Sequence, residues 1–233
     1  MADRLDYTHA LIVGAGEGLS ASLARLLAAD GLKISLAARN PDKLKDLEAE
    51  VGAVAHSCDA AKPADVDMLF AALDAGGAPD VVIYNPSARV RGPFVELDPD
   101  GVRKTLEVSA FGGFLVAQQA ARRMLEAGKG AILFTGASAS VKGYAQSAPF
   151  AMGKFALRGL AQSMARELHP QGVHVGHVVI DGAIRNPGRE EPADKPDSML
   201  DPDAIALSYR HFLAQPRSAW SWEIEVRPWV ERF

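Results

Sequence analysis

The sequence of 233 residues contains a single cysteine, Cys58, and six histidines. One cysteine cannot form an internal disulfide and is typical of a reducing compartment. Neither Cys58 nor the scattered histidines have the spacing of a zinc site, so no metal is expected. No uninterrupted apolar run reaches the roughly 18 residues that a membrane span requires. The polar, charged residues 1–7 do not resemble a signal peptide. We therefore expect a cytoplasmic protein without a membrane partner.

An excess of charge of either sign is also missing. The chain has 25 basic and 29 acidic residues, which give a net charge of −4. No basic block stands out, so nucleic acid is not expected as a partner. Apolar residues make up 48% of the sequence, which suffices at this length for the core of one large α/β domain. Repeats, low-complexity tracts and interdomain linkers are absent, and residues 1–233 are predicted to form a single domain.

Strand-like and helix-like segments alternate along the chain. The predicted strands are 9–13, 33–38, 53–56, 80–84, 131–134, 173–180 and 220–226. The predicted helices are 19–29, 41–51, 63–73, 100–127, 149–169 and 202–213. This alternation predicts an α/β fold: a single Rossmann-type domain of three layers, with a doubly wound parallel sheet of about seven strands covered on both faces. Residues 183–203, rich in proline and charge, are expected to form a lid over the carboxyl ends of the strands.

A glycine-rich loop separates the first predicted strand from the first predicted helix. It contains Gly14, Gly16 and Gly18, with Glu17 inside it and Leu19 after it. Glycines let the backbone approach a pyrophosphate, and a helix N-terminus offers free N–H groups to it. The spacing is not the G-x-G-x-x-G form. The loop predicts a dinucleotide phosphate site, and a tight strand–helix turn without a ligand is the alternative.

Two further features indicate a dinucleotide. Arg39 ends the second predicted strand, where dinucleotide folds place an acid for the ribose 2′-OH of NAD or an arginine for the 2′-phosphate of NADP. Arg39 therefore favours NADP, although Glu17 would repel an additional phosphate, and a solvated loop arginine is the alternative. The Gly112-Gly113 pair inside the predicted helix 100–127 indicates close packing by a partner helix or a ligand.

The most helix-like segment of the sequence is 149–169. Pro149 suits the first turn of a helix, where its missing N–H is not needed. Phe150 and Lys154 lie four residues apart and share one face of this helix. An aromatic ring and an ammonium group therefore point together over the start of the helix.

Taken in order, these motifs resemble the short-chain dehydrogenase/reductase family over nearly the whole chain. The matching elements are the glycine loop, Asp59, the turn 84–87 and the segment 150–154. The resemblance implies an NAD(P)(H)-dependent oxidoreductase that acts on a small molecule and forms a homodimer or homotetramer through helices 100–127 and 149–169. It also implies a set of cofactor contacts, at Gly14, Gly16, Glu17, Gly18, Leu19, Arg39, Asp59, Ala60, Asn85, Lys154, Gly182 and Ile184.

The departures from the family pattern concern the catalytic tetrad of asparagine, serine, tyrosine and lysine. These positions correspond to Ser109, Ala137, Phe150 and Lys154, so only the lysine is kept. The family tyrosine exchanges a proton, which a phenyl ring cannot do, and losing a positioned acid–base group slows a reaction by about 10²–10⁴. Losing the serine donor removes part of the oxyanion stabilisation. The usual proton-transfer route is therefore not expected here.

Three hypotheses follow for the activity. The first is a divergent NADP-dependent oxidoreductase that uses Lys154 and a rebuilt acid–base group, with Ser138, Tyr144 and Asp181 as candidates. Each candidate has a structural alternative: Ser138 as a turn cap, Tyr144 as a pocket wall or interface residue, and Asp181 as an acceptor for loop N–H groups. The second is a non-catalytic NADP(H)-binding sensor or scaffold protein. The third is a lyase or isomerase in which the cofactor is structural.

Overall fold

The computed structural model describes residues 5–231 and contains one central sheet of seven parallel strands. The strand order is β3-β2-β1-β4-β5-β6-β9. The strands are β1 (His9–Val13), β2 (Lys33–Ala38), β3 (Val54–Ser57), β4 (Val81–Tyr84), β5 (Gly130–Thr135), β6 (Val173–Ile180) and β9 (Glu223–Val226). This confirms the predicted doubly wound, parallel α/β fold of about seven strands.

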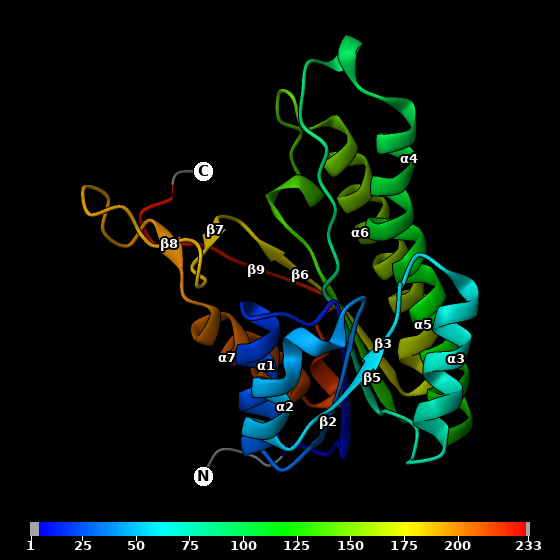
Figure 1. Cartoon of the computed structure of the whole chain (residues 1–233). Coiled ribbons are helices and arrows are strands. Elements are labelled where there is room, and N and C mark those ends of the chain that lie inside the picture. The colour runs from blue at the N-terminus through cyan, green and yellow to red at the C-terminus, as the bar shows by residue number, and fades with distance from the viewer. Residues whose placement is uncertain (1–4, 232–233) are drawn as a thin grey trace.

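Helices cover both faces of the sheet (Figure 1). One face packs against α1 (Leu19–Ala29), α2 (Lys45–Val51) and α7 (Pro202–Leu213), and the other against α3 (Pro63–Asp74), α5 (Gly112–Ala127) and α6 (Ala148–Leu168). Successive residues of a strand point to opposite faces, and so Leu11 and Ile12 of β1 belong to the two different cores. Within residues 5–231, no helix combines the length and the apolarity that crossing a membrane requires.

The strand order reverses between β1 and β4. From β1 the chain turns through α1 toward β2, whereas the later strands β4, β5 and β6 progress toward the opposite edge. The connections that follow β1 and β4 therefore diverge to opposite faces and leave a crevice between them, which is where doubly wound folds bind ligands. Val13 pairs with Tyr84 at the ends of these two strands, and this places the glycine loop beside Asn85.

The predicted helix 100–127 is not one regular α-helix. It consists of α4 (Pro99–Leu106), a π-helical segment (Glu107–Phe111) and α5. The predicted helix 41–51 likewise begins with a 3₁₀ turn, Pro41–Leu44, before α2. A π-helical segment inserts one extra residue into the helix and is frequent at functional sites. The segment 107–111 contains Ser109, the residue expected at the family's asparagine position.

The Gly112-Gly113 pair allows close packing inside the chain. A Cβ on Gly112 would lie 2.5 Å from the Tyr84 hydroxyl oxygen and 2.7 Å from the Ala60 carbonyl oxygen, and one on Gly113 would lie 2.7 Å from a methyl carbon of Leu157. Both glycines therefore bring α5 against β4 and α6. Close packing was the expectation, and α6 is the partner helix.

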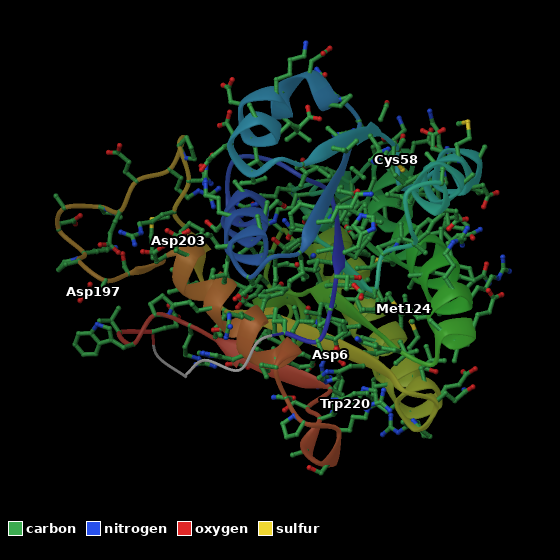
Figure 2. The ribbon with its side chains drawn as sticks, turned by 90° about the horizontal axis from the view of Figure 1, so that it is seen from below. Asp6, Cys58, Met124, Asp197, Asp203 and Trp220 are labelled. Carbon is green, nitrogen blue, oxygen red and sulfur yellow. The ribbon has the colours of Figure 1, made fainter. Side chains whose placement is uncertain are left out.

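The predicted lid contains a small parallel sheet of its own. Its strands β7 (Ala183–Ile184) and β8 (Met199–Leu200) flank the segment 185–198. Figure 2 shows Asp197 in the part of this segment that projects away from the sheet, and Asp203 at the start of α7. Asn186 and Arg189 close a turn through backbone hydrogen bonds of 3.1 and 2.9 Å. The lid therefore joins the end of β6 to α7.

Candidate active site and cofactor cleft

A cleft of about 770 Å³ lies at the crevice between β1 and β4. Of the predicted cofactor contacts, the cleft is lined by Gly14, Gly16, Glu17, Gly18, Arg39, Asp59, Ala60 and Asn85. Leu19 is buried at the start of α1, and Lys154 is buried in α6. Gly182 and Ile184 stand outside the lining, which includes their neighbours Asn186 and Pro187 instead. The lid therefore meets the cleft two residues further along the chain than the sequence suggested.

Two glycines of the loop have different roles. The fold requires glycine at position 14, whereas Gly16 keeps space open at the cleft. Gly14 has a φ of +77°, and a Cβ there would lie 2.7 Å from the Pro86 nitrogen. A Cβ on Gly16 would meet no atom within 4 Å, so this position opens onto the cleft. Gly18 caps α1 without a side-chain hydrogen bond. A backbone that approaches closely and a helix N-terminus without a side-chain cap fit a pyrophosphate.

Asn85 holds this loop instead of pointing freely into the cleft. Its side-chain nitrogen donates to the Ser20 hydroxyl at 2.7 Å, and Ser20 donates to the Gly14 carbonyl at 3.1 Å. The backbone N–H of Asn85 also donates to the Val13 carbonyl at 3.0 Å. The end of β4 therefore fixes the shape of the loop that follows β1.

The far end of the cleft carries two positive charges. Arg39, Asn40 and Lys43 line it together, and the Asn40 side chain accepts the Asp42 N–H at 3.1 Å to start the 3₁₀ turn that presents Lys43. Lys43 was not predicted as a cleft residue, because a lysine in the predicted helix 41–51 is typical of an ordinary helix surface. Two cations at the end of β2 and beyond it offer positive charge to an anionic group in the cleft.

Phe150 and Lys154 lie on one face of α6, as predicted, and both are buried, with 6% and 2% of their surface exposed. The Lys154 ammonium nitrogen lies 6.0 Å from the Phe150 ring centroid and donates to the Thr135 carbonyl at 2.7 Å. Burial, together with the positive charge of Arg89, lowers the pKa of Lys154 to about 8. An ammonium group with a perturbed pKa therefore lies at the end of β5, next to a ring that has no proton to exchange.

A buried series of hydrogen bonds holds the turn after β5, which contains Ala137. The Ala137 N–H donates to Ser140 Oγ at 3.1 Å, and Ser140 Oγ lies 3.2 Å from His177 Nε2. His177 Nδ1 lies 2.9 Å from the carboxylate of Glu223, which Arg158 contacts with two nitrogens. Burial lowers the pKa of His177 to about 4, so its ring is neutral near pH 7.

These hydrogen bonds support the turn and do not form a nucleophilic site, because Ser140 and His177 are both fully buried. Gly136 permits it, since a Cβ there would lie 2.4 Å from His177 Nε2. These residues are not predictable from the sequence, because they come together only when β5, β6 and β9 lie side by side.

Ser109, at the family asparagine position, is fully buried. Its Oγ accepts the Ala88 N–H at 3.4 Å. A Cβ on Gly153 would lie 2.7 Å from Ser109 Cβ, so the π-helical segment and α6 are in close contact here. Ser109 therefore ties α6 to the loop that follows β4.

The three candidate acids occupy different environments. Asp181 is 3% exposed and pairs with Lys142 at 2.9 Å and Arg227 at 3.4 Å. Burial alone would raise its pKa, but hydrogen bonds from Lys142 and Ser138 and the charges of Lys142 and Arg227 hold it below the ordinary value. Asp181 is therefore ionised near neutral pH and holds no proton to donate. Ser138 is half-buried and donates toward Asp181, while Tyr144 is 49% exposed in the loop before α6.

With this geometry in place, known proteins can be compared. A family model described as short chain dehydrogenase matches residues 8–193. D-threitol dehydrogenase of Mycolicibacterium smegmatis is 31% identical over 181 residues, which cover 75% of this chain and 70% of that protein. The chain belongs to the short-chain dehydrogenase/reductase family. Its members are oxidoreductases that act on small molecules.

Solved structures of the family have the same fold. A short-chain dehydrogenase from Rhodopseudomonas palustris superposes with a TM-score of 0.82 at 38% identity, and the match covers 95% of this chain and 99% of that one. An alcohol dehydrogenase from the archaeon Thermococcus sibiricus, solved with 5-hydroxy-NADP, gives a TM-score of 0.85 at 25% identity, over 97% and 98% of the two chains. The family model, the relative and the solved structures thus confirm the resemblance found in the sequence.

Proposed function

We propose that this short-chain dehydrogenase/reductase is an NADP(H)-dependent oxidoreductase whose tetrad retains only the lysine. The carrying observation is the cleft itself, because the glycine loop and the cations Arg39 and Lys43 line it together. The buried Lys154, outside this lining, donates to the Thr135 carbonyl at the end of β5. The relative solved with 5-hydroxy-NADP supports the choice of cofactor. Arg39 and Lys43 would hold the 2′-phosphate, the loop from Gly14 to Gly18 the pyrophosphate, and Lys154 the nicotinamide ribose. When bound, the cofactor supplies or accepts a hydride.

The protein residues then provide position and charge, since Phe150 exchanges no proton. The ammonium of Lys154 places positive charge at the end of β5, and oxyanions are stabilised by charge in a water-poor site. Ser138 and Tyr144 remain the candidates for a rebuilt proton donor, because Asp181 is ionised. Reduction of an activated double bond, in which the hydride moves between carbons, makes smaller demands on such a donor and suits this site.

The two missing hydroxyls also support a second candidate, a protein that binds NADP(H) without turnover as a sensor or scaffold. NADPH oxidation across a panel of carbonyls and enones separates the two. Turnover that is lost in Tyr144→Phe or Ser138→Ala supports the oxidoreductase and locates its donor. Background rates in the parent protein, with activity gained by Ala137→Ser combined with Phe150→Tyr, support the sensor. NADPH that fails to raise the melting temperature contradicts both candidates.

A second copy of the chain is the proposed partner, through α5 and α6 with the π-helical segment before α5. Phe111 and Phe114 stack with ring centroids 6.2 Å apart and are 45% and 41% exposed, and Met152 and Phe155 of α6 are 49% and 45% exposed. Large apolar side chains exposed along two neighbouring helices are typical of an interface. Light scattering after size exclusion should give a dimer or tetramer that dissociates in Phe114→Glu. A parent protein that is monomeric at micromolar concentration contradicts this assembly.

A further inference from the structure

Arg89, in the loop after β4, lies over the ring of Phe150. Its guanidinium carbon is 3.9 Å from the ring centroid. A guanidinium placed face-on over an aromatic ring makes a cation–π contact with its flat face and keeps its five N–H donors in the plane, free for other partners. Among residues 5–231, no hydrogen bond or ion pair engages these donors.

Positive charge dominates the surroundings of Arg89. Burial lowers its pKa, and the charges of Arg91 and Arg189 lower it further, while no carboxylate acts in the opposite direction. Lys154 is close enough for the charge of Arg89 to lower its pKa as well. Arg91 belongs to the same loop as Arg89, whereas Arg189 comes from the lid. Two segments that are distant in the sequence therefore contribute cations to one place.

Arg89, Arg91 and Arg189 are exposed to solvent, which screens their mutual repulsion and leaves them accessible to an anion. Structural arginines of this chain look different: Arg25, Arg123 and Arg158 each contact a carboxylate with two nitrogens. The cofactor phosphates have their own loop and cations at Gly14–Gly18, Arg39 and Lys43, and Arg89 is outside that lining. The position over Phe150, beside Lys154, belongs to the substrate half of the site.

We propose that Arg89, seated on Phe150 and assisted by Arg91 and Arg189, binds an oxyanion of the substrate. The substrate is thus a carbonyl or enone compound that carries a carboxylate or a phosphate. This inference rests on the proposed oxidoreductase function where it calls the ligand a substrate. Binding of an anion at this site requires no turnover. The planar donors of Arg89 match both oxygens of a carboxylate, and this geometry distinguishes arginine from lysine. In this arrangement Phe150 serves as the platform that orients the guanidinium.

The test compares charged probes with their neutral counterparts in binding experiments. Acetoacetate and levulinate are paired with their methyl esters, and dihydroxyacetone phosphate with dihydroxyacetone, by thermal shift and calorimetry on the full chain with and without NADPH. The variant is Arg89→Met. The control is Arg217→Met, which removes an exposed arginine that also contacts a ring, Trp220 at 5.9 Å, and that precedes the edge strand β9 instead of following the central strand β4.

The parent protein and Arg217→Met should bind at least one charged probe about tenfold more tightly than its neutral counterpart, and Arg89→Met should lose this preference. High salt should weaken the charged probe only. Carboxylate and phosphate sources are separated by which pair shows the effect. If no charged probe is preferred, or if Arg89→Met binds as the parent does, the inference is wrong. An Arg89-dependent preference without any effect of NADPH on stability would instead retain the anion site and refute the proposed function.

Discussion

The buried ammonium of Lys154 should make the stability of this protein rise between pH 7 and pH 9. The pKa of Lys154 is lowered from 10.5 to about 8 in the folded chain. A lowering of this size corresponds to about 3 kcal/mol that folding loses when the group is charged in both states. The folded state binds fewer protons than the unfolded chain between the two pKa values, so this penalty is complete below the folded value and is relieved as the pH rises.

Replacement of Lys154 by methionine removes the titrating group and keeps a side chain of similar length. Linkage with the two pKa values gives a relief of about 1 kcal/mol between pH 7 and pH 9 in the parent protein, and none in the variant. The lost hydrogen bond to the Thr135 carbonyl changes the stability of Lys154→Met by an amount that does not depend on pH. The prediction therefore concerns only how the stability difference between the parent protein and Lys154→Met changes from pH 7 to pH 9.

Urea unfolding of both proteins at pH 7 and pH 9 measures this change without knowledge of the substrate. The control is Lys104→Met, which removes an exposed lysine of α4 and should leave the difference from the parent flat. A difference between parent and Lys154→Met that is also flat from pH 7 to pH 9 would refute the argument, because the ammonium would then be as well solvated in the folded chain as in the unfolded one.

The cofactor cleft gives further predictions. Gly14→Ala should destabilise the protein without any ligand by about 2–4 kcal/mol in chemical unfolding, because the added methyl meets Pro86 and φ is +77°. Gly16→Ala should leave that stability nearly unchanged and weaken NADPH protection, and similar losses in both variants would contradict the distinction. Arg39→Ala should weaken NADPH binding by calorimetry more than NADH binding, and equal losses would argue against a 2′-phosphate site.

Most of the fold could be predicted because it depends on local patterns. Strands such as His9–Val13 and Lys33–Ala38 are apolar runs bounded by turn residues, and their limits agree with the structure. Helix α1 was predictable from glycine on one side and Asp30-Gly31 on the other. The π-helical segment was not, because Glu107–Phe111 has the same apolar spacing as an α-helix, and its extra residue arises from tertiary packing.

The candidate site could be predicted only where one continuous motif builds it. The glycine loop and the pair Phe150 and Lys154 each come from a single stretch of chain. The support of Ala137 depends on Ser140, His177 and Glu223, which three neighbouring strands or their ends contribute. No local pattern predicts such a chain of hydrogen bonds, because each member alone is an ordinary polar residue of a strand or a turn.

The energetics of Lys154 also bear on whether this site is a remnant. A site that binds no ligand gains nothing from an ammonium that is 2% exposed and repelled by Arg89, and a methionine would fill the same space with less desolvation. Arg89 itself is exposed to solvent, so its charge carries no comparable desolvation penalty. The charge of Lys154 therefore destabilises the protein without a ligand, and the proposed contact with the cofactor ribose would offset part of this cost. Under the proposed function, a buried ammonium kept at this position favours a site that still binds the cofactor over a remnant that has lost it.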